Sequence, residues 1–120
     1  MNCRKNEQQI DIRITRILLS LGVPVSSKGF DYMRRCIIEA YYDKEITSLI
    51  TKTLYPKVAR LCKAENAGAV ERTCRRMVTN ALKRAEPDVW RRYFGVEPYK
   101  MNCAQFVSAI ANYLRTEYEN

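Results

Sequence analysis

The sequence contains no histidine among its 120 residues. Histidine is the commonest general base, the usual partner of a nucleophilic serine or cysteine, and a frequent zinc ligand. Without it, no nucleophile–base pair or metal cluster is recognisable, and the few glycines form no phosphate-binding loop. These absences argue against an enzyme, and we expect neither a metal ion nor a cofactor.

Long apolar runs are also missing. No stretch approaches the roughly 18 consecutive apolar residues of a membrane-spanning helix. The opening residues MNCRKNEQQI carry charges and amides where a secretory signal needs an apolar core. We therefore expect a soluble, cytoplasmic protein that does not bind a membrane.

Glycine and proline are scarce, with four of each, and 47% of the residues are hydrophobic. This composition is typical of a folded globular chain. The length suits one hydrophobic core, so residues 1–120 are expected to form a single domain. The five cysteines make an odd count with no closely spaced pair, which indicates reduced, mostly buried thiols and neither a disulfide framework nor a metal site.

Positive charge is present in excess and is concentrated in one part of the chain. There are 21 Lys and Arg against 13 Asp and Glu, a formal net charge of +8. Residues 44–95 hold 12 of the basic and 5 of the acidic residues, so this block alone carries a net charge of +7. Such a block is typical of a surface that binds a polyanion, most often nucleic acid, or of an ordinary solvated surface. Charge alone leaves both interpretations open.

Apolar residues recur at helical spacing through most of the chain, and no segment shows the sustained alternation of a strand. The fold class is therefore all-α, a bundle of about six helices. We expect helices over residues 10–21, 26–41, 43–55, 56–63 and 67–85 and from 102 onward, with a short aromatic helical turn at 88–94 and a loop at 96–101.

Residues that begin and end helices support these boundaries. Gly22 suits the end of the first helix, and Ser27 offers a hydroxyl that can cap the second. Asn66 is placed to cap the helix from residue 67, and Asn102 with Gln105 three positions later forms a capping-box pattern.

A short helix, a brief turn and a longer basic helix, over about residues 56–85, follow the order of a helix-turn-helix. The turn lacks the glycine of the tightest version and is about one residue longer. On a helical wheel the core face of the longer helix consists of Val70, Cys74, Met77, Val78, Ala81, Leu82 and Ala85. The opposite face carries Arg72, Arg75, Arg76, Thr79 and Lys83.

This outward face has the chemistry to read a DNA major groove, because an α-helix fits the groove and arginine pairs with the O6 and N7 acceptors of guanine. Glu71 can accept from cytosine N4 or orient Arg72. The alternative is a solvated basic face, which many surface helices show. The predicted base contacts are Glu71, Arg72, Arg75 and Arg76. The predicted backbone contacts are Lys28, Lys52, Lys57, Thr79 and Lys83.

Three strings, GVPVSSKGFDYMRR, ITSLITKTLYPKVARLC and AVERTCRR, stand in this order with short linkers. With them the chain resembles the DNA-binding effector domains of sporulation-initiation response regulators from endospore-forming Firmicutes, over roughly residues 10–118. The resemblance implies a six-helix bundle with an embedded helix-turn-helix that binds tandem DNA boxes as a head-to-tail pair. It aligns Glu71, Arg72, Arg75 and Arg76 with the residues that read the box.

Two departures from that family concern the recognition helix. Ala69 stands where the family usually has an arginine, and Arg76 stands where it often has histidine. The DNA sequence that the family prefers therefore does not carry over directly to this chain. The family's proteins also carry an N-terminal phosphoacceptor receiver domain, and nothing before Ile10 resembles one. The chain is then either an excised domain or a stand-alone effector that phosphorylation does not switch directly.

Two functions remain in view. The first is a sporulation-type transcription regulator that binds specific double-stranded DNA, with the helix of residues 67–85 in the major groove. The alternative is a non-enzymatic interaction module that contacts another regulator or RNA polymerase and binds DNA weakly. Arg91 and Arg92 are candidates for contact with either RNA polymerase or the DNA backbone.

Overall fold

The computed structural model describes residues 4–118, and all the regular structure in that range is helical. The elements are α1 (Glu7–Ser20), α2 (Lys28–Tyr42), η1 (Lys44–Leu49), η2 (Ile50–Leu54), α3 (Tyr55–Leu61), α4 (Ala67–Lys83), α5 (Pro87–Phe94) and α6 (Cys103–Tyr118). The expectation of an all-α fold with six α-helices is confirmed.

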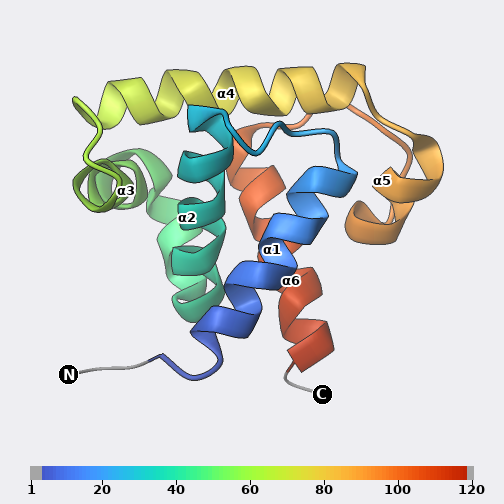
Figure 1. Cartoon of the computed structure of the whole chain (residues 1–120), viewed down its shortest axis with the longest axis horizontal. Helices are drawn as coiled ribbons and strands as arrows, with labels where there is room; N and C mark the ends of the chain where they lie inside the picture. Colours follow the sequence, from blue (N-terminus) through green and yellow to red (C-terminus); the bar gives the residue numbers. More distant parts are fainter. Residues whose placement is uncertain (1–3, 119–120) are drawn as a thin grey trace.

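Helix α4 lies across one end of the bundle, and α1, α2 and α6 run away from it (Figure 1). The start of α1 and the end of α6 are at the opposite end of the molecule. Helix α2 is the central element, because it packs against α1, α4 and α6 and is buried on most of its circumference. A helix that is enclosed in this way needs apolar residues on several faces, and its sequence supplies them.

The predicted helix caps are present. The Ser27 hydroxyl accepts a hydrogen bond from the amide of Phe30 at 3.1 Å. At the start of α6, the side chains of Asn102 and Gln105 each accept from the other's backbone amide, at 2.8 and 2.9 Å. Gly22, just after α1, has a φ of +84°, a conformation that glycine adopts without strain.

The segment predicted as a helix over residues 43–55 is not an α-helix. It forms a 3-10 turn and then a wider π-type turn, and the backbone of Leu49 departs from helical geometry between them. Pro56 accounts for the end of the segment, because it has no amide hydrogen to bond the carbonyl of Lys52 in a continuing α-helix. The hydroxyls of Thr47 and Ser48 also donate to backbone carbonyls three residues earlier, at 3.4 and 2.7 Å, which competes with regular helix formation.

Two smaller predictions also need correction. Residues 87–94 form a complete α-helix, α5, and not merely an aromatic turn; Trp90 is fully buried against Phe94. Helix α4 ends at Lys83, two residues before the expected end. The guanidinium of Arg84 instead donates to the carbonyl of Gly22 at 2.8 Å and ties the end of α4 to the loop after α1.

The described cysteines are all free thiols. Cys36, Cys74 and Cys103 are buried and Cys62 is half-buried, while Cys3 lies outside the described residues. Within residues 4–118 no group of side chains is arranged to hold a metal ion. No helix in that range is long and apolar enough to span a bilayer.

One charged side chain is buried in the bundle. Glu39, near the end of α2, is 2% exposed and contacts three cations. Arg4, in the segment before α1, binds both of its carboxylate oxygens at 2.7 and 2.9 Å. Lys57 on α3 approaches one of them at 2.7 Å, and Arg35 approaches the other at 3.5 Å. Glu39 therefore joins the segment before α1, helix α2 and the first helix of the helix-turn-helix.

The buried carboxylate predicts a specific acid sensitivity. Burial by itself raises the pKa of Glu39, but the hydrogen bonds from Arg4 and Lys57 outweigh it and lower the pKa from 4.5 to about 2. Stabilisation by the ionised group is therefore fully present above pH 4.5 and is lost as the pH falls toward 2. In urea unfolding across this range, the difference in unfolding free energy between wild type and Glu39→Gln should shrink with acidification. Glu65→Gln, at an exposed position, serves as the control, and a constant difference for Glu39→Gln would contradict the assignment.

Candidate nucleic-acid interface

Helices α3 and α4 are joined by residues 62–66 and form the helix-turn-helix. The turn contains no glycine. Lys63 instead adopts the left-handed conformation, with a φ of +57°, and the amide of Ala64 donates back to the carbonyl of Ala59 at 2.8 Å. This pattern closes the end of α3 in the way that a glycine usually does, so the missing glycine does not prevent the motif.

Helix α4 begins at a side-chain cap and is fixed by its apolar face. The side chain of Asn66 accepts from the amide of Ala69 at 2.9 Å, as the sequence predicted. The buried residues of the helix are Val70, Cys74, Met77, Val78 and Ala81. They belong to the main hydrophobic cluster, apart from Ala81, and α4 packs on both α2 and α3.

The opposite face of α4 is open to solvent along its whole length. Of the predicted contacts on this helix, Glu71 is half-buried and the others are exposed: Arg72, Arg75, Arg76, Thr79 and Lys83. The structure therefore brings these six residues together on one surface, which we call the α4 stripe. Figure 1 shows α4 at the end of the bundle, and the exposure of five of these six residues shows that the rest of the described chain leaves the α4 stripe open.

Glu71 forms an ion pair with Arg75 at 2.9 Å, one helical turn away. Glu71 was predicted to accept from cytosine N4 or to orient Arg72, and the structure shows Arg75 as its ion-pair partner. The side chain of Arg75 remains 67% exposed, so the pair aims a guanidinium outward without burying it. The hydroxyl of Thr79 donates to the carbonyl of Arg75 at 3.0 Å, and it has to leave this bond to donate to a ligand.

Arg72 and Arg76 form no hydrogen bond or ion pair with any described residue. The guanidinium of Arg72 extends back over the first turn of α4, since a β-carbon added to Gly68 would lie 3.2 Å from its Nη1 atom. Arg76 lies on the flank of α4 that faces the start of α2. Both guanidiniums are available for an external acceptor.

The predicted backbone contacts outside α4 differ in their positions. Lys28 is exposed at the start of α2, and Lys52 is exposed on η2. Lys57 is committed to Glu39, which lies near the far end of α2, whereas Gly29 at the near end packs against Met77 of α4. The ammonium group of Lys57 therefore points away from α4.

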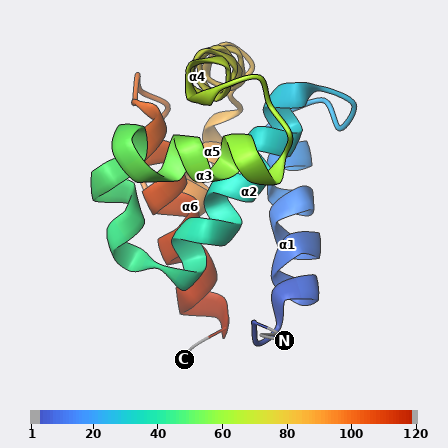
Figure 2. The same ribbon diagram turned by 90° about the vertical axis from the view of Figure 1, so that its left-hand side faces the viewer.

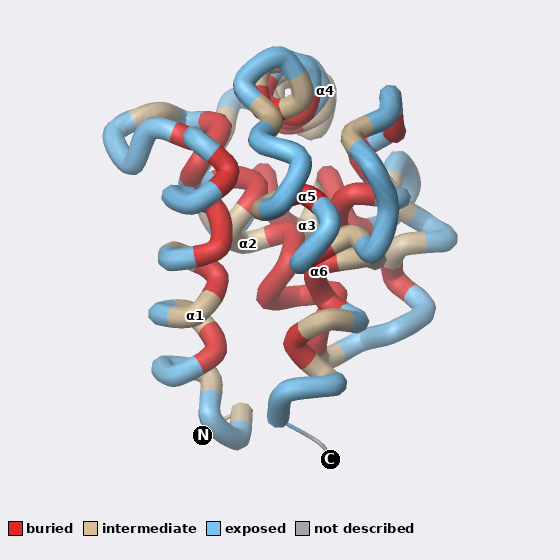
Figure 3. Tube along the Cα trace, turned by 90° about the vertical axis from the view of Figure 1, so that its right-hand side faces the viewer, coloured by how far each residue is buried: buried red, intermediate tan, exposed pale blue. Residues whose placement is uncertain are grey.

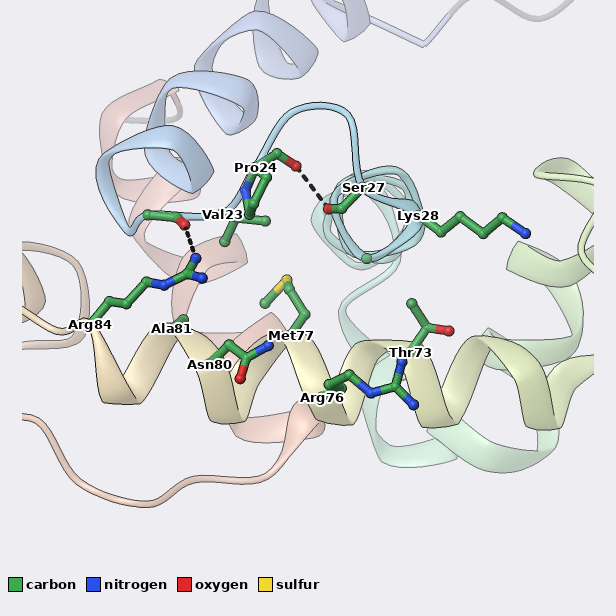
Figure 4. A pocket seen from close by; sticks show the side chains of 12 residues that line it. Val23, Pro24, Ser27, Lys28, Thr73, Arg76, Met77, Asn80, Ala81 and Arg84 are labelled. Carbon is green, nitrogen blue, oxygen red and sulfur yellow. Dashed lines mark hydrogen bonds between the residues drawn. The ribbon is translucent and has the colours of Figure 1, made fainter.

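A cleft lies on each side of α4. The first, of about 280 Å³, is bounded by the α1–α2 loop and the start of α2, with Lys28 and Arg76 on opposite walls. Figure 4 shows Met77 pointing into it from α4, opposite Val23. The second, of about 800 Å³, separates α4 from η2 and from the loop before α6, which contributes Lys100. Sequence reasoning missed Lys100, because its loop has no helical period from which to assign a face.

The residues proposed for polymerase contact are not equivalent. Arg91 forms ion pairs with Asp88 and Glu97. Arg92 is exposed and has no hydrogen bond or ion pair to the described part of the chain. Of the two, Arg92 is the one whose charge is free for a partner.

An all-α bundle in which the second helix of a helix-turn-helix presents an uncovered basic face has the architecture of a DNA-binding domain. Comparison with known families agrees with this class. Residues 14–114 match the family described as Sporulation initiation factor Spo0A C terminal, and the chain belongs to that family. It is thus a member of a family of DNA-binding domains of sporulation transcription factors, and the resemblance found in the sequence is confirmed.

The cap of α4 gives a direct test of how this helix is held. Asn66→Ala removes the acceptor for the Ala69 amide, so we expect the first turn of α4 to fray and the unfolding free energy to fall by about 1 kcal/mol. Urea unfolding gives the energy, and amide hydrogen exchange at Ala69 locates the change. Asn102→Ala, which uncaps α6, is the matched control and should leave exchange in α4 unaltered. Unchanged protection of Ala69 in Asn66→Ala would contradict the cap.

Proposed function

We propose that the chain is a transcription regulator that binds specific double-stranded DNA by inserting α4 into the major groove. The observation that carries this proposal is the α4 stripe, a row of exposed cations on the second helix of a helix-turn-helix. The major groove, about 12 Å wide, admits one α-helix. Helix α4 lies across the end of the bundle with the α4 stripe turned to solvent, so this face is the one that can enter the groove.

Base reading falls to residues 71–76 of α4. Arg72 and Arg76 carry unpartnered guanidiniums that suit bidentate pairing with guanine O6 and N7. In the Glu71–Arg75 pair, the carboxylate can accept from cytosine N4 while it holds Arg75 in position. A neighbouring carboxylate also disfavours phosphate at that point, which helps to fix the register of the helix.

Contacts to phosphate position the helix. The exposed lysines bind phosphate oxygens, namely Lys28, Lys52 and Lys83, and the hydroxyl of Thr79 donates to another. Lys57 can contact a phosphate only if its ammonium group exchanges its ion pair with Glu39 for the phosphate oxygen. Arg4 makes this exchange possible, since its two bonds keep the buried carboxylate paired.

A selection from random duplex DNA at physiological salt tests the proposal as a whole. A sequence-specific regulator should enrich one box. Arg72→Ala and Arg76→Ala proteins, taken through the same selection, show whether the enrichment depends on α4. If wild type enriches no box, the proposal fails and the interaction-module function is favoured, with RNA polymerase or another regulator as the partner.

Removing a base-reading arginine should relax specificity at one position of the box. For Arg72→Ala and for Arg76→Ala we expect a loss of about 1–3 kcal/mol in discrimination at the corresponding base pair. Titration of the box and of its single-base variants by fluorescence anisotropy measures this loss. Lys83→Gln provides the comparison, because loss of a phosphate contact weakens binding to all sequences alike. Equal discrimination in wild type and both arginine variants would contradict base reading.

Binding to tandem boxes should be cooperative. We expect a monomer to bind one box weakly and two adjacent boxes more tightly, by roughly a factor of ten or more, because neighbours then touch. Mobility shifts on one-box and two-box duplexes measure the gain. Moving the second box by about 5 base pairs, half a helical turn, places it on the other side of the DNA and should abolish the gain. Equal affinity per box on all three duplexes would contradict pairing.

A further inference from the structure

Two loops stand on opposite sides of α4. In Figure 2, where α4 is seen nearly end-on, the α1–α2 loop lies to one side of it and the loop of residues 95–102, between α5 and α6, rises on the other. The opposite view in Figure 3 shows the same arrangement. Of the predicted phosphate contacts, Lys28 lies on the first side, and Lys52 belongs to η2, which borders the cleft on the second side. No contact was predicted in the loop of residues 95–102.

The loop of residues 95–102 is braced at both ends. At its start, Gly95 has a φ of +74° and Glu97 is ion-paired with Arg91 at 2.5 Å. At its end, Met101 is 8% exposed and Asn102 belongs to the reciprocal cap of α6. A loop fixed in this way presents its middle in a defined position and loses little conformational entropy on binding.

The middle of the loop presents an aromatic and a cationic side chain to solvent. Tyr99 is 45% exposed, and Lys100 is exposed and makes no hydrogen bond or ion pair to the described residues. Lys100 lines the larger cleft together with Glu71, Arg75 and Thr79 of the α4 stripe, and the Glu71 carboxylate there is already paired with Arg75. One wall of this cleft therefore carries a base-reading candidate and the opposite wall carries an unpartnered ammonium group.

We propose that Lys100 is a DNA-backbone contact that holds the strand bordering the groove on the Arg75 side of α4. This inference rests on the proposed function, because it takes α4 to lie in the major groove. A helix in the groove has a phosphate backbone on each side. Lys28 faces the strand on the Arg76 side, and the braced loop places Lys100 on the other. A flexible ammonium group suits phosphate, whose oxygens accept from many directions.

The salt dependence of binding measures this contact. Lys100→Gln should reduce the slope of log K against log salt by about 0.9, the value for one phosphate contact. It should weaken binding to the selected box and to its single-base variants by the same factor. Lys44→Gln is the matched control, because Lys44 is exposed and follows the end of α2 away from α4. This control removes the same charge and should leave the slope nearly unchanged.

A backbone substitution locates the phosphate. Neutral methylphosphonates placed one at a time along each strand should include one position that weakens wild type and the Lys44→Gln protein but not Lys100→Gln. Equal salt slopes for the two lysine variants, or no such position, would overturn the assignment of Lys100 alone. If wild type shows no salt-dependent binding to any duplex, the proposed function fails, and this contact fails with it.

Discussion

The packing of α4 across α2 and α3 is the contact on which the recognition surface depends. Side chains on an α-helix repeat about every 3.6 residues. Burial of Val70, Cys74 and Met77 therefore fixes the direction in which the side chains between them point. Arg72 and Arg76 are then turned to solvent on a helix that caps the bundle. The same apolar interaction that stabilises the fold therefore aligns the cations in one row.

The elements around α4 fix its surroundings. Arg84 bonds the end of the helix to the α1–α2 loop, and Asn66 caps its start. Glu39 ties the segment before α1 to α2 and α3 through Arg4 and Lys57. Such a buried, fully paired carboxylate is costly to disturb, so it restrains α3 against the core while α4 stays free on its outer side. A rigid frame of this kind lowers the entropic cost of DNA binding.

Much of this was predictable from sequence, because it depends on neighbours along the chain. The caps at Ser27, Asn66 and Asn102 and the two faces of α4 follow from local patterns. The Glu71–Arg75 pair has the favourable helical spacing of four residues, so the sequence contains the information to predict it. The prediction paired Glu71 with the adjacent Arg72 instead. The turns before α3 also involve near neighbours, the hydroxyls of Thr47 and Ser48 and Pro56, but an apolar helical period does not show that these bonds win over a regular helix. The partners of Glu39 and the place of Lys100 depend on contacts between residues far apart in the sequence.

Methylation interference on a duplex enriched from random DNA tests the central claim most directly. Dimethyl sulfate methylates guanine at N7 in the major groove and adenine at N3 in the minor groove. With α4 in the major groove, N7 methylation at specific guanines should block binding, and the Arg72→Ala or Arg76→Ala protein should lose the interference at one of them. Interference confined to adenine N3, or none at any guanine, would contradict the account.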